Sequence, residues 1–559
     1  MPFKRLIPVL VLIAALLSLP AFAAAPASGR NGMVASSEPL ASQAGVEILQ
    51  AGGNAIDAAV AVGFALAVTF PQAGNLGGGG FMLIRKASGE SIVVDYREQA
   101  PAAATRGMFQ DAHGDLIPHS STVGARAAAV PGTVMGLAMA EEKYGRLGLA
   151  RVMAPAIRLA RNGFPVSKSL ARNIRSQRSL MQRFDGSRRI FLHNGKLYEP
   201  GETFRQPDLA RTLAGIAKHG PDAFYSGPPA KALVATMQKY NGLITHDDLE
   251  HYQAKLRPPL LGHFRGFDIL TAPPPSAGGT MLIEMLNILE PLDLGSAHSY
   301  TSIHLLAETM RRAYADRAAY LGDADFATVP VAGLTSPRYA AQLRNEILAA
   351  PVNAPVHAGQ PQFYESGATT HFSVVDAEGN AVANTYTLNG WFGCGVTVEG
   401  AGYLLNNEMD DFTTKPGAPN LFGLVQGEAN AVAPRKRPLS SMTPTIVVGD
   451  GKARLVLGSP GGSTITNTVL QVLLNVLVYK MDVLQAVSLP RFHDQWSPDR
   501  LSFERTGFAS DTIEKLQKAG YPVSFRDSMG DCEAIEVDPQ SGWRFGASDP
   551  REDGKAVGY

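Results

Sequence analysis

The sequence predicts an α+β protein in which layers of helix and sheet stack on one another rather than close into a barrel. Helical patterns come first along the chain, strand patterns concentrate in its final third, and a helical pattern returns after them. Gly and Pro are spread evenly, so we expect no flexible linker between domains. No period of about 20–50 residues recurs, which argues against a repeat architecture.

The first strong helical pattern runs from Asn54 to Phe70 and is rich in Ala and Val. Asn54 is a good N-cap residue, and Asp57 in the first turn favours the positive end of a helix. The segment is apolar nearly all round, which predicts a helix buried between two layers. Further helical patterns lie around Asp208–Ala217, Pro229–Lys239, Tyr300–Tyr320 and Pro337–Ala349.

A hairpin is predicted where two strand patterns, Thr370–Val375 and Ala381–Leu388, flank the turn-forming segment Asp376–Asn380. If that segment is a five-residue loop, counting outward places Thr369 opposite Thr387. Directly opposed residues have Cβ atoms about 4.5–5.5 Å apart, close enough for one hydroxyl to orient the other. A loop one residue shorter or longer would break this pairing.

A second strand pair, Thr443–Val448 and Arg454–Leu457, flanks the turn Gly449–Gly451. A helical pattern then begins near Ser463 and continues through Thr468–Tyr479. Strands followed by a returning helix complete the predicted layers.

Composition indicates an ordinary globular protein with a large core. Of the 559 residues, 45% are hydrophobic and 18% are charged, and 50 basic residues balance 50 acidic ones. The longest basic run, Arg435-Lys436-Arg437, is too short to mark a nucleic-acid surface. No nucleic-acid partner is therefore expected.

The N-terminus has the pattern of a signal peptide over residues 1–23. Lys4 and Arg5 precede an apolar run from Leu6 to Leu19, and Ala21-Phe22-Ala23 supplies small residues for cleavage after Ala23. The run is shorter than the roughly 20 residues of a membrane span. We expect release into a bacterial periplasm or the medium, with no membrane attachment afterwards; an uncleaved anchor is the alternative.

Thr369 is the candidate nucleophile. It stands where a loop rich in Pro, Gly and Ala, Pro351–Gly367, enters a predicted strand. If the chain were cut before it, one residue would carry a hydroxyl and an α-amine, whose reference pKa of about 7.7–8.0 lets it accept the hydroxyl proton near neutral pH. The alternative is an ordinary loop-to-strand junction, where Thr is common.

A glycine-containing segment, Leu457–Thr464, lies between a predicted strand and a helix. Gly461 and Gly462 let the backbone approach a ligand, and N–H groups at a helix start favour negative charge. An oxyanion formed by attack on an amide needs such donors. A phosphate-binding loop is the competing interpretation, although the lysine of that motif is missing; a plain tight turn is the other.

Three further segments carry groups suited to an amino-acid-like substrate. Asn406–Asp411 holds several carboxylates, Pro438–Met442 holds two adjacent hydroxyls, and Asp95–Glu98 holds an arginine that matches a carboxylate. Each has an ordinary alternative: an acidic turn in solvent, a polar loop, or a surface ion pair.

These motifs, in this order, resemble the γ-glutamyltranspeptidase family of N-terminal nucleophile hydrolases. The resemblance covers essentially the whole mature chain and is carried by Gly52–Ala59, Asn75–Phe81, Asp95–Glu98, Pro273–Gly279, Thr369–His371, Asn406–Phe412, Pro438–Met442 and Ser459–Ser463. It implies a four-layer αββα sandwich and a precursor that cuts itself between Ala368 and Thr369. The products would be a large subunit, 24–368, and a small catalytic subunit, 369–559, joined in one globular heterodimer.

The resemblance also implies the chemistry. The residue at Thr369 attacks γ-glutamyl amides such as glutathione, and the acyl-enzyme passes to water or to an amino acid or dipeptide acceptor. The family needs no metal and no organic cofactor. The residues that match its site are Thr387, which hydrogen-bonds the nucleophile; Gly461 and Gly462, which form the oxyanion hole; Arg97, Ser440 and Ser441, which bind the α-carboxylate; and Asn389, Glu408 and Asp411, which surround the α-amino group.

The charges favour γ-glutamyl substrates over other acyl groups. A γ-glutamyl head is zwitterionic, so its site needs a cation and an anion, which Arg97 and Asp411 supply. A cephalosporin or glutaryl acylase on the same scaffold would leave Asp411 as a costly unpaired buried charge. That acylase is the second enzymatic hypothesis, and an uncleaved periplasmic binding or scaffold protein is the non-enzymatic one.

Two positions depart from the family pattern. In the segment Lys415–Gly423, which resembles the family's lid over the glutamyl pocket, Phe422 stands where many bacterial members have Tyr. Trp391 is bulkier than the usual residue; we favour core packing for it, and a role in acceptor preference is the alternative. Of the two cysteines, Cys394 and Cys532, we expect two free buried thiols rather than a bridge.

Overall fold

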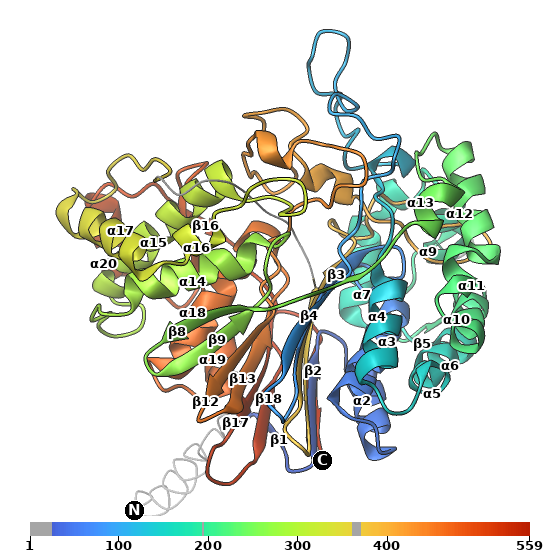
Figure 1. Ribbon diagram of the computed structural model, residues 1–559, viewed down its shortest axis with the longest axis horizontal. Coiled ribbons are helices and arrows are strands. Elements are labelled where there is room, and N and C mark those ends of the chain that lie inside the picture. Colours follow the sequence, from blue (N-terminus) through green and yellow to red (C-terminus); the bar gives the residue numbers. More distant parts are fainter. Residues whose placement is uncertain (1–24, 193–194, 360–369) are drawn as a thin grey trace, which may run out of the picture.

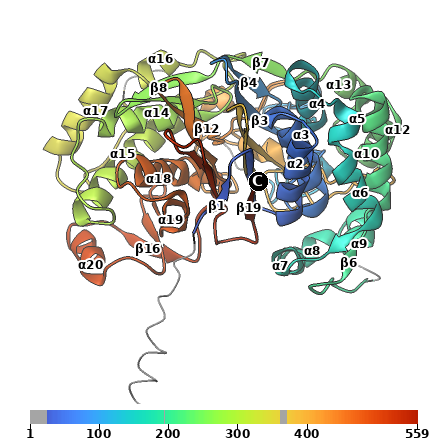
Figure 2. The same cartoon turned by 90° about the horizontal axis from the view of Figure 1, so that it is seen from below.

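The computed structural model describes residues 25–192, 195–359 and 370–559. Two seven-stranded antiparallel sheets face each other, and helices cover the outer face of each (Figure 1). Seen from below, the helical layers lie on either side of the paired sheets (Figure 2). This αββα sandwich confirms the predicted fold class. The signal-peptide prediction for residues 1–23 and the nucleophile prediction for Thr369 fall outside the described residues.

Each sheet draws strands from both sides of the expected cleavage point. In spatial order, the first sheet contains β19 (Lys555–Gly558), β2 (Gly32–Ser36), β10 (Thr370–Asp376), β11 (Ala381–Thr387), β3 (Gly79–Arg85), β4 (Ser91–Asp95) and β7 (Lys255–Arg257). The second contains β1 (Ala27–Gly29), β18 (Arg544–Ala547), β17 (Glu533–Val537), β13 (Lys452–Gly458), β12 (Thr445–Gly449), β9 (Phe267–Thr271) and β8 (Leu260–Phe264). Two small sheets are formed by β14 (Phe492–His493), β15 (Leu501–Glu504) and β16 (Val523–Arg526), and by β5 (Phe164–Pro165) and β6 (Thr203–Phe204).

Both helical layers bury an apolar core against their sheet. The layer on the first sheet is formed by α2 (Pro39–Gln50), α3 (Ala55–Thr69), α4 (Thr133–Tyr144), α5 (Leu149–Val152), α6 (Ala154–Asn162), α7 (Lys168–Ser176), α8 (Arg178–Met181), α9 (Asp185–Phe191), α10 (Pro207–His219), α11 (Asp222–Tyr225), α12 (Pro228–Lys239) and α13 (His246–Glu250). The layer on the second is formed by α14 (Ala277–Leu289), α15 (Tyr300–Tyr320), α16 (Val331–Leu334), α17 (Pro337–Ala349), α18 (Ile465–Leu477), α19 (Val483–Ser488) and α20 (Ser510–Lys518). A third apolar cluster fills the space between the sheets.

The expectation that strands concentrate in the final third is incomplete. Strands β2, β3 and β4 in the first hundred residues belong to the first sheet. Every residue of β2 and β3 is buried, because these strands lie between a helical layer and the other sheet. A strand buried on both faces loses the alternation of polar and apolar residues that makes strands recognisable in a sequence.

The predicted helix starting at Asn54 is confirmed as α3. The Asn54 side chain accepts hydrogen bonds from the N–H groups of Ile56 and Asp57, and Asp57 accepts one from the N–H of Asn54. This reciprocal cap satisfies backbone donors that the first helical turn leaves unpaired. Every residue of α3 is buried, as its all-round apolar surface predicts. The bounds of α15 and α17 also match their predicted ranges.

The predicted register of the first hairpin is confirmed over the described residues. Val375 pairs with Ala381, and the pairing runs to Thr370 opposite Tyr386. The Asp376 carboxylate closes the loop by accepting hydrogen bonds from the N–H groups of two residues within it. Within the described residues, no helix is long and apolar enough to cross a membrane.

Candidate active site

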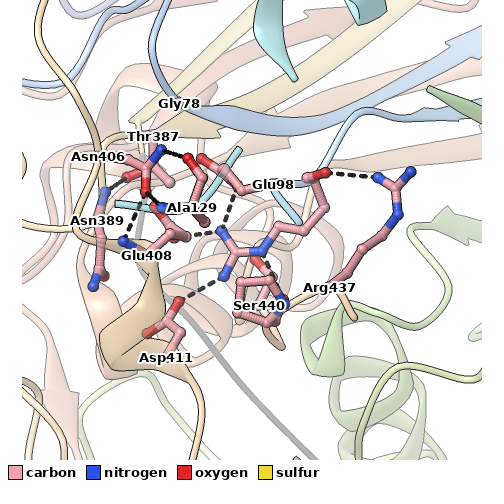
Figure 3. Close-up of polar contacts among 12 residues, drawn as sticks. Gly78, Glu98, Ala129, Thr387, Asn389, Asn406, Glu408, Asp411, Arg437 and Ser440 are labelled. Atoms are coloured by element: carbon pink, nitrogen blue, oxygen red, sulfur yellow. Dashed lines mark hydrogen bonds and ion pairs between the residues drawn. The ribbon is translucent and has the colours of Figure 1, made fainter. Parts of the chain in front are cut away.

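The predicted site residues gather at one edge of the two sheets, where β4, β11 and β13 end (Figure 3). Arg97 follows β4 and has no exposed side-chain surface. Its Nε donates to the carbonyl of Pro438 at 2.8 Å and one Nη donates to Asp411 Oδ2 at 2.6 Å. Its other Nη donates to Glu408 and, at 3.3 Å, to Glu98. The structure therefore gathers one cation and three carboxyl groups.

The carboxyl groups around Arg97 hold their protons more tightly than usual. Burial raises the pKa of Asp411 to about 6, against the opposing charge of Arg97. Burial likewise raises the pKa of Glu98 to about 7 and that of Glu408 well above its ordinary value. Burial opposes the charge of Arg97, but the three neighbouring carboxylates still raise its pKa. The arginine stays charged while the acidic groups can gain or lose protons near neutral pH.

Backbone and amide contacts hold Glu408 and Asp411 in place at the two ends of a 3₁₀ turn, Glu408–Asp411. Asn406 Oδ1 accepts from the N–H of Glu408 at 3.0 Å, while its Nδ2 donates to the carbonyls of Gly77 and Ala129. Asn430 Nδ2 donates to the carbonyl of Asp411 at 2.6 Å. We did not assign Asn406 a role from the sequence, although it heads the acidic motif.

Ser440 and Ser441 lie beside this network and are buried. Arg97 Nη donates to the carbonyl of Leu439 at 3.3 Å, which fixes the backbone directly before Ser440. The N–H of Ser440 donates to the carbonyl of Pro275 at 2.9 Å, and its own carbonyl accepts from Ala277. The Pro-rich motif thus serves to position the serine loop.

Thr387 ends β11 with its side chain buried. Its Oγ1 accepts a hydrogen bond from the N–H of Asn389 at 2.7 Å, and its carbonyl accepts one from Asn75 Nδ2 at 2.7 Å. The Asn75–Phe81 motif is glycine-rich because its backbone lies against the end of β11. A Cβ on Gly78 would lie 1.8 Å from the Thr387 carbonyl oxygen. The glycines therefore allow a close backbone approach that fixes the end of β11.

Asn389 has a left-handed backbone, with φ of 73°. Its Nδ2 donates to the carbonyl of Asn407 at 3.0 Å, while its Oδ1 has no hydrogen-bond partner among the described residues. A buried acceptor without a donor is rare in a folded protein and is consistent with a place for a ligand. Asn389 also lines a cavity of about 570 Å³ beside Gly461 and Gly462.

The glycine loop after β13 turns into a short 3₁₀ segment, Gly462–Thr464, that leads into α18. Gly461 and Gly462 have φ of 138° and 60°, which only glycine adopts readily. No described side chain caps this turn. The predicted turn is confirmed, and both glycines line the cavity.

Phe422 lies directly over the glycine loop. A Cβ on Gly462 would come within 2.5 Å of its Cδ1. Asn420 Oδ1 holds the loop by accepting from the N–H of Phe422 at 3.0 Å and that of Leu424 at 3.1 Å. Asp410 accepts from the N–H of Leu421 at 2.8 Å, so this loop is tied to the acidic turn.

Core packing, our favoured interpretation of Trp391, is wrong. Its side chain is 42% exposed and lines the cavity, with only an edge contact to Phe70 at 6.1 Å between ring centres. The neighbouring residue Phe392 is the one that is fully buried. Both residues are large and apolar, so the sequence does not distinguish which of them enters the core.

His371, the third residue after the expected cleavage point, is held by contacts within the sheets. Its Nδ1 lies 2.8 Å from Thr385 Oγ1 and its Nε2 lies 3.0 Å from Ser373 Oγ. Burial lowers its pKa to about 3, so the ring is neutral at ordinary pH. The ring packs against Gly458 at the start of the glycine loop.

Cys394 and Cys532 are free and buried, as predicted. Burial raises the pKa of Cys394 to about 12, so its thiol is unreactive at neutral pH. Within the described ranges, no group of three or more His, Cys, Asp or Glu side chains has the arrangement of a metal site.

An αββα sandwich with a polar site at one edge of both sheets is the architecture of an N-terminal nucleophile hydrolase. More narrowly, the chain belongs to the γ-glutamyltranspeptidase family, whose model matches residues 41–559.

The relatives fall into two functional groups. The glutathione hydrolase proenzyme of Escherichia coli (strain K12) is 48% identical over 543 residues, covering 96% of this chain and 93% of that protein. The acylase ACY 1 proenzyme of Pseudomonas sp. (strain SE83) is 39% identical over 544 residues, covering 95% and 94%.

Solved structures repeat this division. A cephalosporin acylase from Bacillus halodurans has a TM-score of 0.87 at 28% identity and covers 97% of this chain and 98% of its own. The Helicobacter pylori γ-glutamyltranspeptidase has a TM-score of 0.55 at 43% identity, covering 59% of this chain and 94% of the matched chain.

Proposed function

We propose that this protein is a γ-glutamyl hydrolase and transferase that acts on glutathione and related γ-glutamyl amides. The observation that carries this proposal is the buried network of Arg97, Glu408 and Asp411, whose ion pairs have no exposed surface. An α-carboxylate and an α-ammonium are the two charges that these groups would bind. A zwitterionic head can replace the internal pairing without leaving a buried charge unpaired.

Maturation begins with cleavage between Ala368 and Thr369. If the register observed from Val375 to Thr370 continues by one pair, Thr369 lies opposite Thr387. The Thr369 hydroxyl attacks the Ala368 carbonyl carbon, the peptide C–N bond breaks and its nitrogen takes a proton, leaving an ester. Thr369 then has a free α-amine, and water opens the ester, which frees the Thr369 hydroxyl and the Ala368 carboxylate.

In turnover, the Thr369 hydroxyl attacks the γ-glutamyl amide while its α-amine accepts the proton. The amide C–N bond then breaks, and the leaving amine takes this proton from the Thr369 α-ammonium. The N–H groups of Gly461 and Gly462 stabilise the oxyanion, and Thr387 orients the nucleophile. Arg97, Ser440 and Ser441 bind the α-carboxylate, and Asn389, Glu408 and Asp411 bind the α-ammonium. The acyl-enzyme is resolved by water or by the amine of an amino acid or dipeptide. Phe422 shields the bound head as a lid, and the steps need no metal or organic cofactor.

The two fragments, 24–368 and 369–559, remain together as a heterodimer. Support comes from the sheets: β10 and β11 insert between β2 and β3, and β18 pairs with β1. Separating the fragments would expose strand edges on both sheets and all three cores. Cleavage therefore changes chain connectivity without dividing the globule.

We place the mature enzyme in the periplasm or the medium, after removal of residues 1–23. The support is the sequence of the N-terminus: two basic residues, an apolar run and a small-residue cleavage site.

An acylase that removes β-lactam side chains is the competing function, favoured by the acylase relatives. The two functions differ at the α-ammonium, which glutaryl groups lack. Comparing turnover of γ-glutamyl-p-nitroanilide with that of glutaryl-7-aminocephalosporanic acid separates them. A clear preference for the glutaryl substrate would reverse our assignment.

The decisive test is N-terminal sequencing of the smaller fragment together with a Thr369→Ala variant. We expect the fragment to start at Thr369, and we expect the variant to remain one chain without activity. Thr369→Ser keeps a hydroxyl and an α-amine and should still be cleaved, and Thr369→Ala, which keeps Thr370, tests whether the neighbouring hydroxyl can substitute. A fully active uncleaved protein would contradict the mechanism.

A further inference from the structure

The cavity of about 570 Å³ beside the glycine loop does not reach the buried Arg97 network. Its lining includes Asn389, Phe422, Gly461 and Gly462, but none of Arg97, Glu408 or Asp411. A volume of this size suits a small ligand. Given the proposed function, the glutamyl head binds at the Arg97 network. The cavity on the other side of the glycine loop then receives the leaving group and, later, the acceptor.

The charges on this open side are unbalanced. Arg551 binds Glu504 and, at 2.8 Å, Asp549. Glu552 binds Arg172 at 3.1 Å. Asp531 is buried, and burial raises its pKa well above the ordinary value.

Arg526, which also lines the cavity and is exposed, is left without an ion-pair partner among the described residues. Burial lowers the pKa of this guanidinium, and Glu504, whose charge opposes that effect, is already paired with Arg551. Arg526 is therefore the cation that the cavity offers to a ligand. Its planar fork matches a carboxylate in two parallel hydrogen bonds.

Arg526 belongs to the segment that packs on the glycine loop, and both line the same cavity. Gly530 packs on the glycine loop, since a Cβ on Gly461 would lie 3.3 Å from the Gly530 Cα. Arg526 precedes Gly530 by four residues, so their Cα atoms are separated by at most about 14 Å.

An apolar wall completes the same cavity. Trp391 is 42% exposed and Leu421 is 48% exposed, and both line it. Apolar and aromatic side chains make up most of the lining of small-molecule sites. Aromatic rings offer contacts with side chains that are themselves aromatic or apolar.

We propose that Arg526 and Trp391 form the subsite for the leaving group and acceptor, with Arg526 binding a free α-carboxylate and Trp391 contacting an apolar side chain. This inference rests on the proposed function and specifies the substrate class of its second half-reaction. The favoured acceptor is a dipeptide with a free C-terminus. The cysteinylglycine released from glutathione ends in such a carboxylate, so the same contacts hold the leaving group.

The test compares two acceptors that differ only at the carboxylate, glycylglycine and glycylglycinamide, with γ-glutamyl-p-nitroanilide as donor. Within each variant, the ratio of the two acceptor KM values removes effects on the donor and on folding. We expect Arg526→Gln to weaken the preference for glycylglycine about fivefold, as for a partly exposed charged contact. Arg505→Gln is the matched control, because Arg505 is exposed, pairs with Asp527 at 2.6 Å and does not line the cavity.

The apolar contact is tested in parallel with phenylalanylglycine against glycylglycine. We expect Trp391→Ala to reduce the preference for phenylalanylglycine about fivefold, the size of an aromatic contact. An unchanged ratio in Arg526→Gln, or an equal change in Arg505→Gln, would overturn the subsite. Absence of γ-glutamyl turnover in the unmutated protein would instead overturn the proposed function, and the subsite with it.

Discussion

Arg97 and Asp411 form an ion pair at 2.6 Å that has no exposed surface, although 314 positions separate them in the chain. Water does not screen a pair that is buried in this way, so each charge depends on its neighbours. Glu408 and Glu98 share the same guanidinium. A site of this kind selects ligands by their charge. A ligand that breaks one of these buried ion pairs must itself offer an opposite charge to each separated group.

Asp411→Asn should weaken binding of γ-glutamyl donors. We expect the donor KM to rise at least about tenfold, because a hydrogen bond to a charged group is lost. The protein should stay folded, since Glu408 and Glu98 still compensate Arg97. Asp410→Asn is the comparison, because Asp410 contacts Ser121 and the lid loop instead. An unchanged donor KM in Asp411→Asn would remove this residue from the site.

Donor binding should strengthen as pH rises from 5 to 8. Asp411 and Glu98 have pKa values of about 6 and about 7, so at pH 5 both are protonated and cannot pair with the substrate ammonium. As pH rises through these values the anions form. For each carboxyl group that loses its proton, the donor KM should fall by up to about tenfold for each unit of pH.

The pH profile of donor KM measures this effect, and Asp411→Asn should flatten its lower part. A KM that instead falls toward acid pH would show that the binding form is protonated.

Gly462→Ala should damage the site through Phe422. The added Cβ would lie 2.5 Å from the Phe422 ring, and Gly462 has φ of 60°. We expect kcat to fall about 100-fold, comparable to the loss of an oxyanion donor. The double variant Gly462→Ala/Phe422→Ala removes the clash but keeps the backbone strain, so it should recover part of kcat. If the double variant is no better than Gly462→Ala alone, the ring contact is not the cause.

Thr387→Ala should slow both self-cleavage and turnover. The Thr387 hydroxyl oxygen accepts a hydrogen bond from the N–H of Asn389. This bond stabilises the left-handed backbone conformation of Asn389. We expect at least about a tenfold loss of kcat, from a buried donor left unpaired and a nucleophile left unoriented. Thr387→Ser restores the hydroxyl and should recover most of both rates. Cleavage followed on a denaturing gel, with kcat measured on the cleaved fraction, separates the two effects; full activity in Thr387→Ala would contradict this role.

Local chemistry made several features predictable. The register Val375–Ala381 follows from a loop whose Asp376 accepts two of its own backbone N–H groups. The start of α3 follows from Asn54 and Asp57, which cap each other. Both depend on residues within four positions of one another, so the sequence contains the whole interaction.

Other features depended on distant partners. Glu98 stood in a predicted motif without an assigned role, and it became part of the site only because β4 ends beside the acidic turn. Trp391 was misassigned because either of two neighbouring apolar residues could fill the core. The strands β2 and β3 were missed because burial on both faces erases their alternation.

The sequence by itself determined the layered fold class, the hairpin, the helix caps, the glycine turn and the residue types of the candidate site. These follow from backbone conformation and from short-range hydrogen bonds, which a few neighbouring residues specify. Only the tertiary structure decided which charges meet, that Arg97 is enclosed by three carboxyl groups, and that Trp391 and Arg526 share one cavity. Such relationships depend on how the sheets pack, and packing brings together side chains that no local pattern connects.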